Sequence, residues 1–150
     1  MKLEEALKQK KPFESEIQKL LININFTSSW FNALFLQTLK PFDITPAQFN
    51  VLRILKGAYP ESYCNQQITE RMVDRSSNST RIVDKLLKKK LIVRKEHKAD
   101  RRLVDIKITP LGLDLLQQIE VSAPMKKMKV AQFNAEKAKL MNEWLDEMRM

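Results

Sequence analysis

Apolar residues recur every three or four positions through the first half of the chain, which is the spacing of amphipathic helices. Over residues 13–39 this pattern predicts one long helix. Thr45 as the N-cap and Pro46 in the first turn predict the start of a second helix, which ends before Pro60. Residues 66–72 predict a short third helix. The first half of the chain is therefore expected to be almost entirely helical.

A fourth predicted helix, over about residues 77–89, has two very different faces. The apolar side chains expected to pack in the core are Ile82, Val83, Leu86 and Leu87. The polar and cationic side chains on the opposite face, free to bind, are Ser77, Asn78, Arg81, Lys85 and Lys88. Residues 74–78 predict a turn whose short side chains can also cap this helix, and Ser76 and Ser77 either cap it or contact a partner.

After the fourth helix the apolar pattern changes to that of β-strands. Residues 91–93 and 103–108 predict two short strands, and the polar residues 95–100 predict the turn of a small hairpin. Residues 109–110 supply a cap and a first-turn proline for a fifth helix, and an apolar stripe beyond about Asn134 predicts a last one. The predicted fold is mainly α with a small β-hairpin, in the order of a helix-turn-helix followed by a wing, with helices left over at both termini.

Basic residues concentrate in the same middle part of the chain. The 150 residues include 27 Lys and Arg against 18 Asp and Glu, a net charge of +9 at pH 7. Residues 65–110 hold 13 of the cations and only six of the acids. Because a local cationic excess attracts polyanions, we expect one dedicated surface for an anionic partner. Charge alone leaves open a solvated lysine-rich face without a partner.

Rare residue types exclude several kinds of chemistry. Gly57 and Gly112 are the only glycines, so no glycine-rich phosphate-binding loop can form. With Cys64 and His97 as the only cysteine and histidine, a disulfide within the chain and a Cys/His zinc site are excluded. We therefore expect no enzyme activity, no cofactor and no metal. Without a leader sequence or an apolar stretch of ~18 residues, the expected location is the cytoplasm.

Three segments follow one another in a particular order and spacing. They are Thr45-Pro46-Ala47-Gln48-Phe49 with Val51-Leu52 after it, Ser79-Thr80-Arg81-Ile82-Val83-Asp84-Lys85-Leu86, and Asp100-Arg101-Arg102 leading into Ile108-Thr109-Pro110-Leu111-Gly112. Over roughly residues 44–116 the chain thereby resembles the MarR family of bacterial winged helix-turn-helix transcription regulators. Lys90 departs from the family, which commonly has Gly there. A lysine must reach the turn conformation at some steric cost, or the helix ends differently.

The resemblance implies a homodimer that binds a palindromic operator. By this resemblance, residues 1–150 form a single MarR-type domain. About residues 1–40 and 111–150 are the dimerisation helices, and about residues 44–110 are the winged DNA-binding region. The terminal helices also carry more large apolar side chains than one small winged region needs to cover. Two copies give a longer and more specific site than one helix-turn-helix can read.

The polar face of the fourth helix is the expected DNA-reading surface. Short polar groups at its start reach base edges, where Asn pairs with adenine and Arg with guanine, and later cations hold phosphates. By resemblance, Arg102 enters the minor groove and Asp100 pairs with an arginine to hold the shape of the wing. The expected DNA-binding residues are Ser77, Asn78, Thr80, Arg81, Lys85, Lys88, Arg94, Lys98, Asp100, Arg101 and Arg102.

Other candidate residues have plainer interpretations. His97 is expected to be a solvated wing residue rather than a sensor. Some family members sense oxidants through a cysteine in the N-terminal helix, but this chain has none there, so packing is favoured for Cys64. Trp30, Phe31 and Phe35 have the helical spacing of core or interface residues. The resemblance leaves open that these three line an effector cleft.

The main hypothesis is a ligand-responsive, dimeric, DNA-binding regulator, by family most often a repressor. Its expected partners are double-stranded DNA and a second copy of the chain, with no membrane, and the resemblance also allows a small-molecule effector. The alternative is a winged-helix module whose basic face binds an acidic protein or an anionic membrane surface. The two differ because operator binding keeps a sequence preference at physiological salt.

Overall fold

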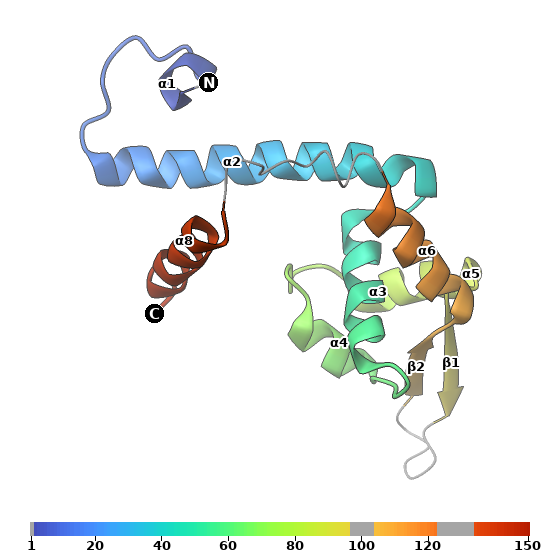
Figure 1. The fold of residues 1–150 in the computed structure, drawn as a ribbon. Helices are drawn as coiled ribbons and strands as arrows, with labels where there is room; N and C mark the ends of the chain where they lie inside the picture. Colours follow the sequence, from blue (N-terminus) through green and yellow to red (C-terminus); the bar gives the residue numbers. More distant parts are fainter. Residues whose placement is uncertain (1, 97–103, 123–133) are drawn as a thin grey trace.

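The computed structural model describes residues 2–96, 104–122 and 134–150, and it confirms the predicted fold class (Figure 1). The helices are α1 (Leu3–Ala6), α2 (Glu16–Leu39), the 3-10 helix η1 (Lys40–Phe42), α3 (Pro46–Ala58), α4 (Asn65–Arg71), α5 (Ser79–Lys88), α6 (Pro110–Val121) and α8 (Ala135–Glu147), and the strands are β1 (Ile92–Glu96) and β2 (Val104–Ile108). The fold is mainly helical with one antiparallel hairpin, which is a winged helix-turn-helix. Its short first helix, α1, is not predicted by the sequence pattern.

The long helix α2 carries the winged-helix elements at its C-terminal end, while α8 lies beside its N-terminal half (Figure 1). Ser15 caps α2 by accepting a hydrogen bond from the backbone N–H of Gln18 at 3.1 Å, so the helix begins a few residues later than the apolar pattern predicts. Thr45 and Gln48 cap α3 reciprocally, at 3.2 and 3.0 Å. These caps fix the residues at which α2 and α3 begin.

A single core joins the elements from the end of α2 to α6. Val51, Leu52 and Leu55 of α3 are fully buried at its centre. They pack with buried side chains from α4, α5, the hairpin and α6, among them Ile68, Val83, Leu86, Ile92, Ile106, Leu116 and Ile119. Because each helix contributes one apolar face to this core, its opposite face is left for solvent or a partner.

The hairpin is joined to α5 by a tight turn. Lys90 adopts a left-handed conformation with φ of 59°. Its N–H bonds the carbonyl of Leu87 at 2.9 Å, and the N–H of Leu91 bonds the carbonyl of Leu86 at 3.1 Å. This pair of bonds is the Schellman arrangement that ends helices, usually on glycine. Lys90 therefore ends α5 as the family's glycine would, and β1 follows at Ile92.

Strand β1 is longer than its apolar run predicts. The turn expected over residues 95–100 is wrong at its start, because Lys95 and Glu96 pair with Asp105 and Val104 in the antiparallel ladder. The reason is that a strand on the protein surface needs only one apolar face, and backbone pairing continues through polar residues. The remaining residues of that predicted turn lie outside the described part of the chain.

Candidate nucleic-acid interface

The cap of α5 lies within the predicted turn over residues 74–78, but at neither of the two serines for which capping was weighed. Asn78 is the N-cap, and its Oδ1 accepts a hydrogen bond from the N–H of Arg81 at 3.0 Å. Ser76 and Ser77, the predicted capping candidates, do not cap α5. Their hydroxyls donate to the carboxylate of Asp74 at 2.6 and 2.8 Å. The difference arises because the first helical residue is Ser79, which places the capping position on Asn78.

Asp74 organises the turn between α4 and α5. The hydroxyl of Ser76, the hydroxyl of Ser77 and the N–H of Ser76 hold the pKa of Asp74 below its usual value. These contacts keep the carboxylate charged and fix the path of the chain into α5. Because both serine hydroxyls donate their protons to Asp74, each can only accept a hydrogen bond from a further partner. The turn itself is predicted by the polar run over residues 74–78, but this role of Asp74 was not predicted.

The two faces of α5 are divided as the sequence predicts. Val83 and Leu86 are fully buried, and Ile82 and Leu87 pack partly buried against the core. Ser79 is also buried, and its Oγ accepts hydrogen bonds from Thr69 at 2.7 Å and from Asn65 at 3.0 Å. These contacts fasten α5 to α4 in the helix-turn-helix. The exposed residues are the N-cap Asn78 and, within α5, Thr80, Arg81, Asp84, Lys85 and Lys88.

Arg81, Lys85 and Lys88 form a cationic stripe on the exposed face of α5. Their spacing of four and three residues places them along one side of the helix. Thr80 lies off this stripe, toward the hairpin, and its Oγ1 accepts a hydrogen bond from the Asn65 side chain at 3.2 Å. The structure thus brings together the predicted reading residues of α5, with the cationic stripe on one side and Thr80 on the other.

The hairpin lies next to α5 and carries one predicted DNA-binding residue within the described part. Arg94 of β1 is half-exposed, and its guanidinium lies 3.1 Å from the carboxylate of Asp84 on α5. The other predicted wing residues are Lys98, Asp100, Arg101 and Arg102, and with His97 they lie outside the described residues.

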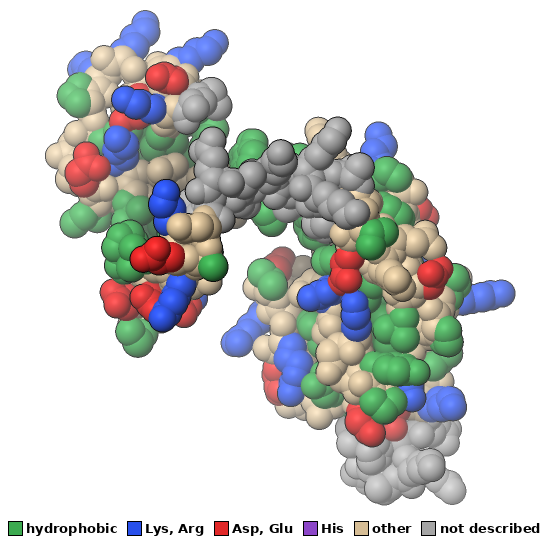
Figure 2. Space-filling model, in the orientation of Figure 1, with side chains coloured by type: hydrophobic (Ala, Val, Ile, Leu, Met, Phe, Trp, Pro, Cys, Tyr) green, Lys and Arg blue, Asp and Glu red, His purple; other side chains and the backbone are tan. Residues whose placement is uncertain are grey.

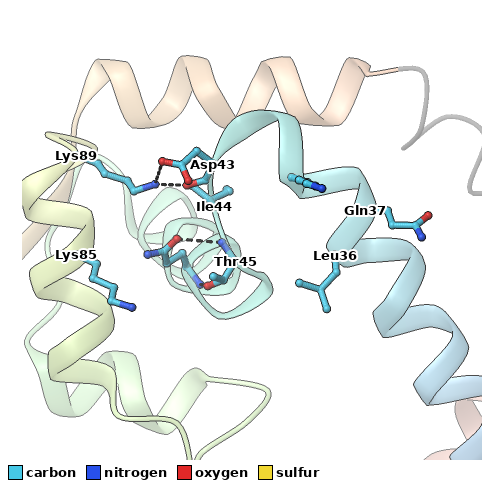
Figure 3. A pocket seen from close by; sticks show the side chains of 9 residues that line it. Leu36, Gln37, Asp43, Ile44, Thr45, Lys85 and Lys89 are labelled. Carbon is cyan, nitrogen blue, oxygen red and sulfur yellow. Dashed lines mark hydrogen bonds and ion pairs between the residues drawn. The ribbon is translucent and has the colours of Figure 1, made fainter.

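A cavity of about 560 Å³ lies between the C-terminal end of α2, the start of α3 and the cationic stripe (Figure 3). Leu36 and Ile44 give it apolar walls, and Lys40, Lys85 and Lys89 bring three cations to its rim. The Nζ atom of Lys89 donates to Oδ2 of Asp43 at 2.6 Å (Figure 3). This contact fastens the end of α5 to the corner between η1 and α3.

The three aromatic residues for which the resemblance left open a place in an effector cleft are not at this cavity. Trp30, Phe31 and Phe35 do not line it. Phe35 packs edge-on against Phe49 with 5.2 Å between ring centroids, so its core role is confirmed. Trp30 is 57% exposed and Phe31 is 40% exposed on α2. Their exposed faces belong to the helix surface rather than to the cavity.

Cys64 is half-buried directly before α4, where its N–H donates to the side chain of Gln67 at 2.9 Å. Over residues 2–96, 104–122 and 134–150, no group of three or more His, Cys, Asp or Glu side chains is placed to hold a metal ion. Within the same residues, no helix has both the length and the apolar character needed to cross a bilayer.

The winged-helix elements match one known family. Residues 44–104 match the sequence model of the MarR family. A segment of 78 residues is 38% identical to the HTH-type transcriptional regulator MhqR of Bacillus subtilis strain 168, covering 51% of this chain and 51% of MhqR. The match therefore spans about half the length of that relative.

Solved MarR structures share the fold along nearly the whole chain. A mutant MarR from E. coli complexed with operator DNA has a TM-score of 0.75 and 24% identity, covering 92% of this chain and 99% of that one. The MarR transcription factor from Planctomyces limnophilus has a TM-score of 0.66 and 26% identity, covering 92% and 98%. The terminal helices of this chain, outside the segment that matches the MarR family, therefore have counterparts in known MarR folds.

Proposed function

We propose that this chain is a sequence-specific regulator of transcription that binds double-stranded DNA as a homodimer. The observation that carries the proposal is the division of α5, whose apolar face is locked into the core while its cationic stripe and N-terminal polar groups face outward. A rigid helix of this kind can enter the major groove. The names of the similar proteins, a transcriptional regulator and a MarR solved with operator DNA, support the same proposal.

The chain acts as a single MarR-type domain in this proposal, with residues 44–110 for DNA and residues 1–40 and 111–150 for dimerisation. Short polar groups at the start of α5 read bases, cations hold phosphates, and the wing enters the minor groove. The residues proposed to bind DNA are Ser77, Asn78, Thr80, Arg81, Lys85, Lys88, Arg94, Lys98, Asp100, Arg101 and Arg102.

Exposed apolar side chains support the homodimer. Leu20 of α2 and Trp144 of α8 are 48% and 58% exposed, and Ile17 and Met148 are exposed as well. Figure 2 shows hydrophobic side chains gathered on α8 and the adjoining part of α2. Apolar surface of this kind is stable in water when a partner covers it, and a second copy would also bring two α5 helices to the two halves of a palindrome.

The sharpest test selects bound sequences from a random pool of DNA duplexes. A regulator recovers one palindromic sequence and binds it on the order of a thousandfold more tightly than unrelated DNA at physiological salt. Attraction to charge alone weakens with salt and recovers no common sequence. Recovery of no sequence would overturn the proposal and favour an acidic protein or membrane as the partner.

Two substitutions test the assigned residues on the selected duplex. Arg81→Ala is expected to weaken binding by about 1–3 kcal/mol and to relax the preference at one base pair. Arg102→Ala is expected to cost about 1 kcal/mol or more while the dimer stays intact. Lys10→Ala, an equal change of charge at an exposed position far from α5, is the control and should leave affinity unchanged.

Release by a small ligand is the finer part of the proposal, and the cavity beside the cationic stripe supports it. An organic anion seated there would engage Lys85, a residue proposed to hold DNA. Benzoate, a flat aromatic carboxylate, is a suitable probe. It should weaken binding of the selected duplex by the wild-type chain and act less on Lys40→Gln, which changes the cavity but no proposed DNA contact. Equal action on both proteins would contradict this site.

A further inference from the structure

Helix α5 carries one carboxylate, that of Asp84, within its cationic sequence. Arg81 and Lys88 lie three and four residues away, at the spacing where side chains on a helix meet. Asp84 nevertheless forms its ion pair with Arg94 of β1, at 3.1 Å. A carboxylate on a helix that approaches DNA repels phosphates. Its direction toward the hairpin indicates a use other than contact with DNA.

The ion pair joins α5 to the inner face of the hairpin. Arg94 pairs across the ladder with Ile106 and shares a face with Ile92, and both isoleucines are buried. Among the residues that the structure describes, Asp84–Arg94 is the only side-chain hydrogen bond or ion pair between α5 and the two strands. On the other edge, β2 is held by backbone bonds, because Tyr63 exchanges N–H···O bonds with Ile106 at 3.1 and 2.9 Å.

Apolar packing does not fix the hairpin at this point. A cavity of about 340 Å³ lies between α4, α5 and the strands, and Thr80, Arg94 and Val104 line it. Side chains at a cavity lack packing partners on one side, so they resist displacement less than a filled core does. The ion pair lies at the edge of this gap. It is therefore the contact best placed to hold the angle between β1 and α5.

Given the proposed function, we propose that Asp84 is a positioning residue that acts through Arg94. The ion pair holds the hairpin at the angle to α5 that lets both elements contact the same operator. This inference replaces the DNA contact proposed above for Arg94, because Arg94 then serves in the ion pair with Asp84 rather than as a contact to phosphate. The angle matters for specific contacts, which need groups at fixed places on the duplex. It matters little for general attraction to phosphate.

The test compares two affinities for each variant, one for the duplex selected by the wild-type chain and one for an unrelated duplex of equal length. Asp84→Asn removes a negative charge, so its affinity for the unrelated duplex should stay equal or rise. Its affinity for the selected duplex should fall by roughly fivefold, the scale of an exposed ion pair. Asp84→Glu keeps the carboxylate and should restore most of the preference.

Glu70→Gln is the matched control, because Glu70 is an exposed carboxylate on α4 that makes no ion pair with the hairpin. It should leave the ratio of the two affinities unchanged. Arg94→Gln should lower the ratio as Asp84→Asn does, and the double variant should lower it no further, since both act through one contact.

Several results would overturn the inference. Equal losses for both duplexes would show general damage to the fold, and gains for both would show that Asp84 only repels DNA. Additive effects of the two substitutions would show that the residues act separately. If the wild-type chain prefers no sequence, the proposed function itself fails, and the inference fails with it. A preference that Asp84→Asn retains in full overturns only the inference.

Discussion

The winged-helix region, from α3 to α6, and the two helices α2 and α8 use apolar residues in opposite ways. In the winged-helix region, Leu52, Leu55 and Leu86 are completely buried within one chain. On α8 no residue is buried, and Trp144 is 58% exposed. The apolar stripe is clear in the sequence of both regions, so the stripe alone does not tell whether a helix packs within its own chain.

The difference teaches which part of the molecule is complete in one chain. The winged-helix region surrounds its core with several short elements, each covering another. Helices α2 and α8 face each other across a cavity of about 410 Å³ that side chains such as Leu20, Ile24 and Trp144 line. We infer that the first region folds on its own contacts, while the second needs a partner to bury its apolar surface.

The largest expected effect comes from removing α8. A chain that ends at residue 133 should be monomeric or poorly folded at its terminal helices, and it should bind the selected duplex at least about a hundredfold more weakly, because two linked copies gain avidity. Sedimentation measures the oligomeric state and titration with labelled duplex measures the affinity. A truncated chain that remains a dimer with full affinity would refute the assignment of α8 to dimerisation.

A pair of glycine substitutions tests the close packing of the winged-helix region. A Cβ atom on Gly112 would lie 2.3 Å from the carbonyl oxygen of Leu91 and 2.7 Å from Cγ1 of Ile108, whereas one on Gly57 would meet nothing within 4 Å. Gly112→Ala should therefore lower the free energy of unfolding by about 1–3 kcal/mol. Gly57→Ala, within α3, should leave it unchanged or raise it by up to about 1 kcal/mol.

Denaturant titration of both variants measures the two effects on one scale. The pair serves as its own control, because both changes add the same methyl group to a helix. Equal effects at the two positions would contradict the tight contact between α6 and the turn at Leu91.

The smallest expected effect concerns the carboxylate of Glu120, which joins α6 to Arg53 and Lys56 of α3. Partial burial opposes its ionisation, but the hydrogen bond from Lys56 and the charges of Lys56 and Arg53 outweigh burial and lower the pKa of Glu120. A lowered pKa in the folded state stabilises the protein above the ordinary pKa, and this stabilisation is lost as the pH falls through the lowered value.

Glu120→Gln should therefore lower the free energy of unfolding at pH 7 by less than about 1 kcal/mol, as exposed ion pairs do. The difference from the wild type should shrink as the pH falls through the lowered pKa of Glu120, because the carboxylate then becomes protonated in the folded state as well as in the unfolded state. Denaturant titrations at pH 7 and at stepwise lower pH measure it, with the exposed Glu61→Gln as a control. A difference that does not shrink on acidification would mean that the shape of the side chain matters rather than its charge.

Much of the candidate interface could be predicted from local patterns. The apolar period of α5 and the Thr-Pro starts of α3 and α6 depend on residues within a few positions of each other, and both were confirmed. The turn over residues 74–78 was predicted to cap α5, but not which of its residues does so, because Ser76, Ser77 and Asn78 are all suitable caps and the choice depends on where the helix begins. The pair Asp84–Arg94 was missed because its residues lie on different elements.

The sequence by itself determined the helical and strand segments, the amphipathic faces and the concentration of cations between residues 65 and 110, since these follow from side-chain chemistry and spacing. Only the tertiary structure decided that Arg94 faces Asp84, that Lys89 reaches Asp43 and that Trp144 is left exposed. Contacts of this kind depend on how separate elements pack in space. A one-dimensional pattern specifies which face of a helix is apolar, but not what lies opposite that face.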